Sequence, residues 1–217
     1  MIAESSNNPP DIWKGQSLHA LCLLTLLLVL YYGWAYLGYP DPAYFWVAAF
    51  IPILHQVFVW VSWRRRLASS DSASALEFRI YLIIFFLLFA SRFVSLFALG
   101  WMDGGSLHLS ATSQFILIAI LLFPGLYAAY SVARYFGMAR AAGADHFDPR
   151  YRDMPFVKAG IFRFTNNGMY FYAFLLFWAV ATGLNSSAAL IVAAFSHAYI
   201  WVHFFATEKP DIKYLYS

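Results

Sequence analysis

The sequence predicts an all-α polytopic membrane protein, and two observations point to this fold class. Of the 217 residues, 62% are hydrophobic and only 12% are charged, whereas soluble domains carry about 25% charged residues. A bilayer core about 30 Å thick needs roughly 20 apolar residues per helix. Six apolar stretches satisfy this requirement approximately, at residues 18–37, 43–63, 80–102, 113–133, 169–184 and 186–206. We therefore expect about six transmembrane helices in one domain, residues 1–217, and no large soluble catalytic domain.

The first four stretches form the N-terminal part of the domain, residues 1–134. The first stretch is too long and too aromatic at its far end for a cleaved signal peptide, so we expect it to remain as a helix. The third stretch contains Arg92, while the other stretches lack Asp, Glu, Lys and Arg. An arginine inside a span pairs, faces a cavity or snorkels to the interface. Outward snorkelling and a buried role both remain open for Arg92.

The last two stretches differ from the others because only a short turn separates them. Residues 164–207 contain no Asp, Glu, Lys or Arg, and Gly183 and residues 185–187 interrupt the run. This pattern predicts a tight helical hairpin. Residues 137–163, in contrast, are polar and broken by glycines and prolines. Residues 135–217, comprising this loop, the hairpin and the tail, are therefore where we expect a binding site.

The basic residues predict the orientation of the chain in the membrane. If the spans alternate, 13 of the 14 Lys and Arg residues lie on the side of the two termini, and Arg92 is the remaining one. The positive-inside rule places that side in the cytoplasm. The positive net charge is then explained by topology and contact with anionic lipid headgroups rather than by nucleic-acid binding. A compact chain of this kind suits a bacterial inner membrane, with a site that faces the cytoplasm.

Familiar motifs for soluble cofactors and metals are absent from the sequence. There is no Walker loop, no glycine-rich turn between a strand and a helix, and no Cys/His cluster with zinc spacing. His197 and His203 are six residues apart, about 600° around a helix, so they point to different faces. We expect no metal site, and the single cysteine, Cys22, cannot form an intramolecular disulfide.

One stretch near the C-terminus carries the strongest functional signal. The sequence Lys-Ala-Gly-Ile-Phe-Arg-Phe-Thr-Asn-Asn-Gly-Met-Tyr at 158–170 precedes the hairpin, and Thr-Glu-Lys-Pro-Asp follows it at 207–211. Their order and spacing resemble the C-terminal signature of integral-membrane methyltransferases, which include phosphatidylethanolamine N-methyltransferase and isoprenylcysteine carboxyl methyltransferase. The matching positions are Gly160, Phe162, Arg163, Thr165, Asn167, Met169, Tyr170, Glu208 and the following Pro210.

The chain departs from the family pattern at several positions. Asn166 and Asn167 stand where the commoner pattern has Arg and His, and Gly168 replaces a proline. The resulting Asn-x-Met-Tyr variant is closer to the phospholipid branch than to the prenyl-cysteine branch. Lys209 replaces a second glutamate. Lys209 would repel an ammonium acceptor if its side chain faced the site. We therefore hypothesise that Lys209 faces water and that Asp211 supplies the second acid.

The resemblance implies S-adenosylmethionine as the methyl donor, bound between the loop, the hairpin and the tail. Such a site needs cations for the donor carboxylate, acceptors for its ammonium and ribose groups, and an apolar floor for adenine. Tyr170, Phe171 and Tyr172 are candidates for the floor. The expected donor-binding residues are Lys158, Gly160, Arg163, Asn166, Asn167, Tyr170 and Glu208. The candidate bases are Glu208, His203 and His146, and the sequence does not rank them.

The acceptor implied by the resemblance is a lipid or a small amphipathic molecule, and we expect a phospholipid amine headgroup. Its phosphate would lie near Arg134, Arg140 or Arg150. Two alternatives remain open. A non-enzymatic membrane protein or transporter would carry paired charges near the bilayer midplane, and an enzyme similar to sterol reductases would bind NADPH instead.

Overall fold

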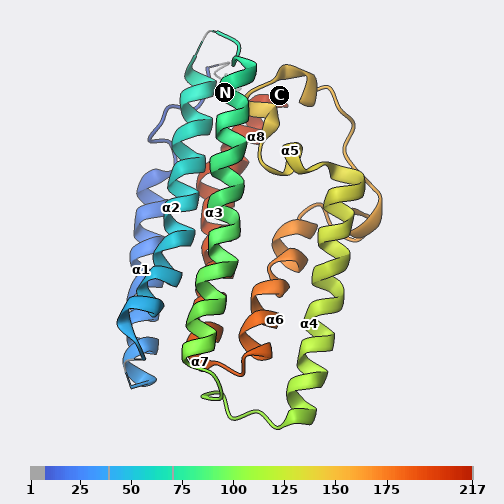
Figure 1. Cartoon of the computed structure of the whole chain (residues 1–217). Coiled ribbons are helices and arrows are strands. Elements are labelled where there is room, and N and C mark those ends of the chain that lie inside the picture. Colours follow the sequence, from blue (N-terminus) through green and yellow to red (C-terminus); the bar gives the residue numbers. More distant parts are fainter. Residues whose placement is uncertain (1–7, 39, 70, 217) are drawn as a thin grey trace, which may run out of the picture.

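The structure is a computed structural model that describes residues 8–38, 40–69 and 71–216 (Figure 1). These residues form helices and connecting segments without any strand, which confirms the all-α class. The α-helices are α1 (Gln16–Tyr36), α2 (Pro42–Ala68), α3 (Ala75–Met102), α4 (Ala111–Ser131), α5 (Met138–Ala141), α6 (Leu175–Gly183), α7 (Ser187–His203) and α8 (Lys209–Leu215). Three π-helical turns extend them, at Val132–Phe136, Met169–Ala173 and Phe204–Glu208.

The lengths of these helices agree with a membrane-spanning protein. Among the described residues, five helical segments are long and apolar enough to cross a membrane: Gln16–Tyr36, Pro42–Ala68, Ala75–Met102, Ala111–Phe136 and Ser187–Leu215. The fifth stretch expected from the sequence forms a shorter apolar helix, Met169–Gly183. At 1.5 Å per residue it is only about 22 Å long. The short helix begins well below the end of α4 (Figure 1), so the number of crossings remains a prediction.

Polar residues next to the apolar runs determine where the long helices begin. Asp41 caps α2, because its Oδ1 accepts hydrogen bonds from the backbone N–H groups of Ala43 (2.9 Å) and Tyr44 (3.2 Å). Ser74 and Ser110 cap α3 and α4 in the same way. Backbone N–H groups in the first turn of a helix have no partner within the helix, so these side chains stabilise each start.

The turn between α6 and α7 is held by the end of α3. Asn185 adopts a positive φ of 55°, and Ser186 Oγ donates a hydrogen bond of 2.6 Å to Asp103 Oδ2. The same carboxylate oxygen accepts the backbone N–H of Ala188 at 2.9 Å. α6 and α7 pack against each other, so the expected tight hairpin is present, anchored by Asp103.

The helices pack around α7, which contacts α1, α2, α3 and α6. The main core lies between these helices and includes Phe45, Leu99, Phe177, Val192 and Tyr199. α4 packs chiefly against α6 and the π turn that precedes it. At the end of the bundle where α4 meets the polar loop, α4 lies apart from α2 and α3 (Figure 1).

Alternation of the helices brings most of the basic residues to one end of the bundle. The α2–α3 connection, the end of α4, the loop 137–168 and α8 all lie at this end (Figure 1). We call it the basic end, and it carries Arg65, Arg79, Arg134, Arg140 and Lys213. The alternating arrangement agrees with the distribution of charge, and the assignment of the basic end to the cytoplasm remains a prediction.

The C-terminal segment differs from the tail expected after residue 206. The last helix continues through the π turn Phe204–Glu208 into α8, so residues 207–211 are helical. Pro210 lies in the first turn of α8. A proline is tolerated at the start of a helix because its missing N–H is not needed there. Glu208 therefore has a position set by a helix rather than by a solvated tail.

Candidate active site

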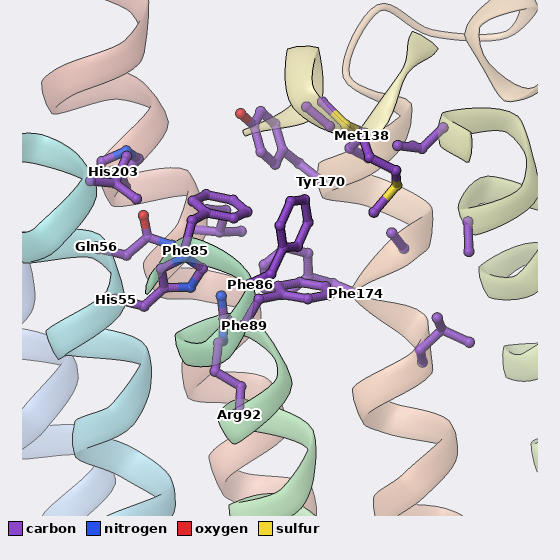
Figure 2. A pocket seen from close by; sticks show the side chains of 18 of the residues that line it. His55, Gln56, Phe85, Phe86, Phe89, Arg92, Met138, Tyr170, Phe174 and His203 are labelled. Carbon is purple, nitrogen blue, oxygen red and sulfur yellow. The ribbon is translucent and has the colours of Figure 1, made fainter. Parts of the chain in front are cut away.

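Two cavities adjoin near the basic end of the bundle. The first, which we call the loop cavity, has a volume of about 430 Å³ and lies between residues 136–167 and the last helix. The second, the membrane cavity, has a volume of about 310 Å³ and lies among α2, α3, α4, α6 and α7 (Figure 2). Both volumes fall in the range of about 300–1,000 Å³ that is usual for small-molecule sites.

The two cavities meet at a hydrogen-bonded pair, Tyr170 and Glu208. Both residues line both cavities, and the Tyr170 hydroxyl donates a hydrogen bond to the Glu208 carboxylate. Tyr170 lies in the π turn Met169–Ala173 and Glu208 in the π turn Phe204–Glu208. Single π turns inside α-helices are frequent at functional sites. This junction is where a group in the loop cavity can meet a group in the membrane cavity.

The wall of the loop cavity combines charged, amide and aromatic groups. Lys158 and Arg140 supply positive charge, and Arg140 is held by hydrogen bonds to the backbone carbonyls of Pro155 (3.1 Å) and Met154 (3.3 Å). Asp145 and Glu208 supply carboxylates. The remaining lining includes the amides of Asn166 and Asn167 and the rings of Phe136, Phe156, Phe162 and Tyr216.

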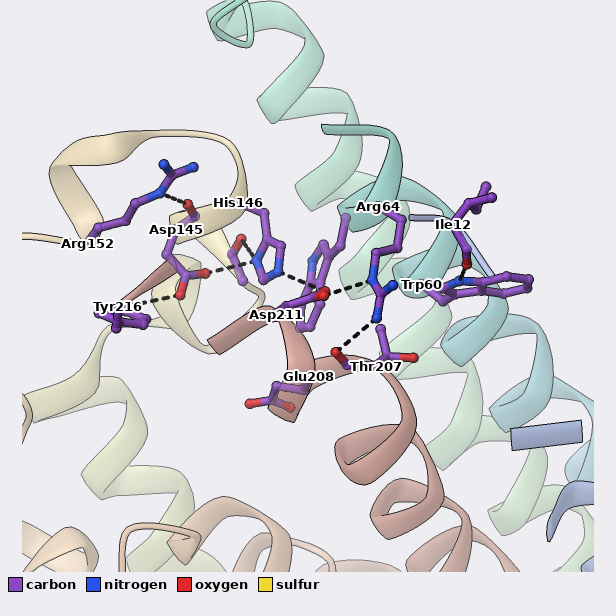
Figure 3. Close-up of polar contacts among 12 residues, drawn as sticks. Ile12, Trp60, Arg64, Asp145, His146, Arg152, Thr207, Glu208, Asp211 and Tyr216 are labelled. Carbon is purple, nitrogen blue, oxygen red and sulfur yellow. Dashed lines mark hydrogen bonds and ion pairs between the residues drawn. The ribbon is translucent and has the colours of Figure 1, made fainter. Parts of the chain in front are cut away.

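A chain of charged side chains beside this cavity links the loop to α8 and α2 (Figure 3). Arg64 Nε lies 2.7 Å from Asp211 Oδ1, and neither side chain is exposed. His146 Nε2 lies 3.3 Å from the other Asp211 oxygen, and its Nδ1 lies 3.0 Å from Asp145 Oδ1. The Arg64 guanidinium also donates hydrogen bonds to the backbone carbonyls of Asp11 and Thr207. Pairing of this kind offsets part of the cost of burying charge.

His146 holds its proton between two carboxylates. Burial alone lowers the pKa of the imidazole, but the hydrogen bonds to Asp145 and Asp211 outweigh burial and raise the pKa above the ordinary 6.5. The ring stacks on Trp63, with centroids 4.1 Å apart and planes inclined by 16°. Because both ring nitrogens are engaged, His146 fixes the loop against Trp63 rather than offering a free basic nitrogen to the cavity.

The structure brings together most, but not all, of the residues singled out from the sequence. Neither Gly160 nor Arg163 lines a cavity, and Arg163 is exposed. Phe171 and Tyr172 also lie outside both linings, so the apolar wall comes from other rings. His203 lines the membrane cavity instead of the loop cavity. The residues that do line the loop cavity are His146, Lys158, Asn166, Asn167, Tyr170 and Glu208.

Gly160 has a structural reason for being glycine. Its φ is +58°, and a Cβ there would lie 2.8 Å from the Ser131 Cβ. The neighbouring Ile161 N–H donates a hydrogen bond of 3.0 Å to Ser131 Oγ. A residue without a side chain lets the turn 160–163 approach the end of α4 closely, and the preceding residues Phe156, Val157 and Lys158 line the loop cavity.

Lys209 and Asp211 occupy different environments. Lys209 is exposed, with its Nζ 5.5 Å from the centre of the Phe205 ring, as expected for a side chain that faces water. Asp211 does not line the loop cavity, because it is bound in the ion pair with Arg64. The structure therefore does not bring Asp211 into the loop cavity as the expected second acid.

The three arginines expected near a lipid phosphate lie in different surroundings. Arg140 lines the loop cavity. Arg150 is exposed and forms an ion pair of 2.7 Å with Asp148, and Arg134 is exposed, with its guanidinium carbon 5.7 Å from the centre of the Tyr135 ring. Of these three, Arg140 is the cation that the structure brings to the site.

Sequence reasoning missed the residues that support the site from α2. In the sequence, Arg64 is the first of three adjacent arginines, and Trp63 is the last residue of the apolar stretch 43–63. Arg64 is 1% exposed and Trp63 is 6% exposed, whereas Arg65 is exposed. Nothing in the triplet itself distinguishes Arg64, because its partner Asp211 is distant in the sequence.

Residues 113–217 match the family model of phospholipid methyltransferases. The match covers just under half of the chain and agrees with the resemblance to integral-membrane methyltransferases. No curated protein and no solved structure matches the chain. The match begins in α4 and covers the loop, the hairpin and α8, so it includes Lys158, Tyr170 and Glu208. Similarity to this family indicates a methyltransferase enzyme.

The match also divides the site into two parts. The lining of the loop cavity lies within residues 113–217 except for Trp63. Much of the membrane cavity comes from α2 and α3, which precede the matched segment, and includes His55, Phe89 and Arg92. Those residues are not covered by the family comparison, so their role has to be inferred from their own contacts.

Proposed function

We propose that the protein transfers a methyl group from S-adenosylmethionine to the amine of a membrane-embedded amphipathic acceptor, with a phospholipid amine headgroup as the expected example. One observation carries this proposal. A polar cavity at the basic end and an apolar cavity among the helices meet at Tyr170 and Glu208. A polar donor and a lipid-like acceptor can each enter the environment that suits it and meet at that junction.

The residues of the loop cavity fit the chemistry of this donor. Lys158 and Arg140 can pair with its carboxylate, and the Asn166 and Asn167 amides can bind its ribose hydroxyls. The aromatic wall includes a stacked pair, Phe136 and Phe162, with ring centroids 5.1 Å apart. When bound, S-adenosylmethionine supplies an electrophilic methyl group on a sulfonium. The cavity therefore presents the cations, hydrogen-bonding groups and apolar surface that the donor requires.

Glu208 is the residue we assign to the acceptor amine. Its carboxylate lies at the junction and accepts the Tyr170 hydroxyl, so it can attract an ammonium group and take a proton from it before attack. His146 is unsuited to this role because both of its ring nitrogens face carboxylates. His203 lines the acceptor side, and its ring nitrogens have no hydrogen-bond partner within the described residues. It can accept the proton in a second step.

Positioning is expected to supply most of the rate. Trp63 and Met169 line both cavities together with the paired Tyr170 and Glu208, so the junction is bordered by aromatic and apolar side chains. Holding two reactants in line inside such a site removes much of the entropic cost of bringing them together. The chain's own residues then need only orient the amine and remove one proton.

The test uses the purified protein in nanodiscs with labelled methyl donor and phosphatidylethanolamine as the acceptor lipid. We expect label in mono- and dimethylated ethanolamine lipid, and we expect Glu208→Gln to lower the rate by about 10²–10⁴-fold because the base is removed. The matched control is Glu77→Gln, an exposed glutamate in the first turn of α3, which should leave the rate unchanged. Labelled protein or no labelled lipid would contradict the amine acceptor.

A further inference from the structure

The membrane cavity has an uneven lining. One side carries His203, Gln56, His55 and Arg92 in succession, and the other side carries phenylalanine rings, among them Phe85, Phe86, Phe89 and Phe174 (Figure 2). A cavity that served only hydrocarbon chains would have no need of a guanidinium and two imidazoles. Polar groups inside the membrane are costly and are usually functional. This arrangement suits a ligand with both polar and apolar parts.

Among the polar side chains of this cavity, Arg92 most clearly lacks a partner of opposite charge. Its residue is 4% exposed, so it lies inside the bundle and does not snorkel outward. Its guanidinium carbon lies 5.1 Å from the centre of the Phe174 ring and 5.0 Å from that of Phe177. The faces of these rings attract the positive charge. They do not supply the oxygen acceptors to which a guanidinium normally donates hydrogen bonds. Within the part of the chain that is described, no carboxylate or carbonyl oxygen pairs with this side chain.

The neighbouring polar groups do not supply the missing acceptor. His55 lies with its ring centroid 4.6 Å from that of Phe85. Neither ring nitrogen of His55 or of His203 forms a hydrogen bond in the residues described. Glu208 is the acidic residue of the lining, and it is bonded to Tyr170 at the junction. The cavity thus combines one buried cation, unpaired imidazoles and an apolar wall.

We propose that the membrane cavity selects an amphipathic acceptor that carries an anionic oxygen group, a carboxylate or a phosphate, and that Arg92 pairs with this group. The apolar body of the ligand lies against Phe86, Phe89 and Phe174. His55 donates or accepts a further hydrogen bond beside the anion. The inference rests on the proposed function in one respect, namely that this cavity is the acceptor side. It adds Arg92, which lies outside the segment matched by the family model, as the residue that recognises the anionic group of the acceptor.

The negative charge of the proposed ligand distinguishes it from neutral molecules with an apolar chain of the same length. An arginine forms strong paired hydrogen bonds with carboxylate and phosphate groups. A neutral alcohol of equal length buries the same apolar surface but leaves the guanidinium without a counter-charge. The selectivity for an anion should therefore come from Arg92, while the affinity common to all ligands comes from the phenylalanine rings.

The experiment measures binding of three probes with the same chain, dodecanoate, dodecyl phosphate and dodecanol, to the full-length protein in nanodiscs at pH 8 by calorimetry. We expect the wild type to bind at least one anionic probe more tightly than dodecanol by about tenfold or more. The two anionic arms distinguish a carboxylate ligand from a phosphate ligand. Equal affinity for all three probes in the wild type would overturn the proposal without the need for any variant.

A pair of variants assigns the selectivity to Arg92. In Arg92→Gln the preference for the anionic probes should disappear, while dodecanol should bind as before. Arg79→Gln provides the matched control, because Arg79 lies on the same helix α3 and is exposed, and it should keep the preference. A preference retained in Arg92→Gln would contradict the role of this residue.

Binding of S-adenosylmethionine separates this inference from the proposed function. Arg92 does not line the loop cavity, so Arg92→Gln should bind the donor as the wild type does. Donor binding without anion selectivity would overturn the inference and retain the proposed function. Anion selectivity without donor binding in the wild type would overturn the proposed function and show that Arg92 recognises a ligand of another activity.

Discussion

At the scale of single residues, His146 connects the stability of the protein to pH. Its pKa in the folded protein is raised above 6.5, because the hydrogen bonds to Asp145 and Asp211 outweigh the opposing effect of burial. The stabilisation from its charged form is fully present below pH 6.5 and is lost as the pH rises through the raised folded pKa. His146 therefore stabilises the loop cavity most under mildly acidic conditions.

The corresponding prediction concerns the thermal unfolding of wild type and His146→Gln between pH 5.5 and 9. The difference in unfolding temperature should be greatest at the low end and should narrow as the pH rises, since only the wild type loses a bound proton. His108→Gln, at an exposed histidine in the α3–α4 connection, serves as the control and should track the wild type. A difference between wild type and His146→Gln that does not change with pH would contradict the prediction.

Two basic residues of the stretch 158–170 provide a test of where the donor binds. Both Lys158 and Arg163 were expected to bind the donor, yet Lys158 lines the loop cavity and Arg163 does not. Lys158→Ala should weaken binding of S-adenosylmethionine by about tenfold, the loss expected for one partly exposed charge-assisted contact. Arg163→Ala should leave the affinity unchanged. Calorimetry in nanodiscs measures both, and the reverse order of effects would place the donor elsewhere.

At the scale of elements, the site depends on three π turns that interrupt otherwise regular helices. They lie at Val132–Phe136, Met169–Ala173 and Phe204–Glu208, all near the basic end. Each turn contributes to the lining of a cavity. The first turn does so through Val132 and Phe136, the second through Tyr170 and the third through Glu208. An extra residue in a helical turn rotates the following side chains relative to a regular helix. The directions of Tyr170 and Glu208 are therefore properties of these turns.

A glycine substitution tests how the turn 160–163 is positioned by α4. Gly160→Ala should destabilise the protein more than Gly137→Ala, by about 1–3 kcal/mol, because crowding in a packed region is added to the backbone strain. Both glycines have a positive φ, but a Cβ at Gly160 would meet Ser131 and Tyr135, whereas a Cβ at Gly137 has nothing within 4 Å. Thermal unfolding of the two variants gives the comparison. Equal losses would mean that the turn shifts freely away from α4.

At the scale of the whole molecule, the orientation in the membrane decides which compartment the donor comes from. Among the described residues, the five long apolar helical segments and the shorter one, Met169–Gly183, run in alternating directions (Figure 1). The α2–α3 connection and the α3–α4 connection therefore lie at opposite ends. The basic residues gather at the end that contains the loop cavity. A cytoplasmic basic end gives this cavity direct access to a water-soluble donor.

A cysteine-accessibility experiment in intact cells tests this orientation. With Cys22 replaced by serine, Gly104→Cys should react with a membrane-impermeant thiol reagent from outside. Ser72→Cys, in the α2–α3 connection, should react only after the cells are opened. Both positions are exposed, so burial does not account for a difference. Labelling of Ser72→Cys from outside would reverse the orientation and separate the site from the cytoplasm.

The sequence by itself determined the class of the protein and much of its helical order, because both depend on local composition. The apolar runs correspond to helices that begin beside Asp41, Ser74 and Ser110, and the turn at Asn185 forms the expected hairpin. It also identified Tyr170 and Glu208, because their spacing around the hairpin resembles a known family. These features depend on neighbouring residues or on the order of residues along the chain, so they can be predicted without knowledge of the tertiary structure.

Only the tertiary structure decided which of the candidate residues share a cavity and which charges are buried. Arg64 resembles Arg65 in the sequence, but it pairs with Asp211 from the other end of the chain. Arg163 belongs to the stretch 158–170, yet it is exposed and does not line the loop cavity. Arg92 could have snorkelled outward, but it lies over Phe174 and Phe177. Burial and pairing depend on the packing of distant segments, and that packing brings the two cavities together at Tyr170 and Glu208.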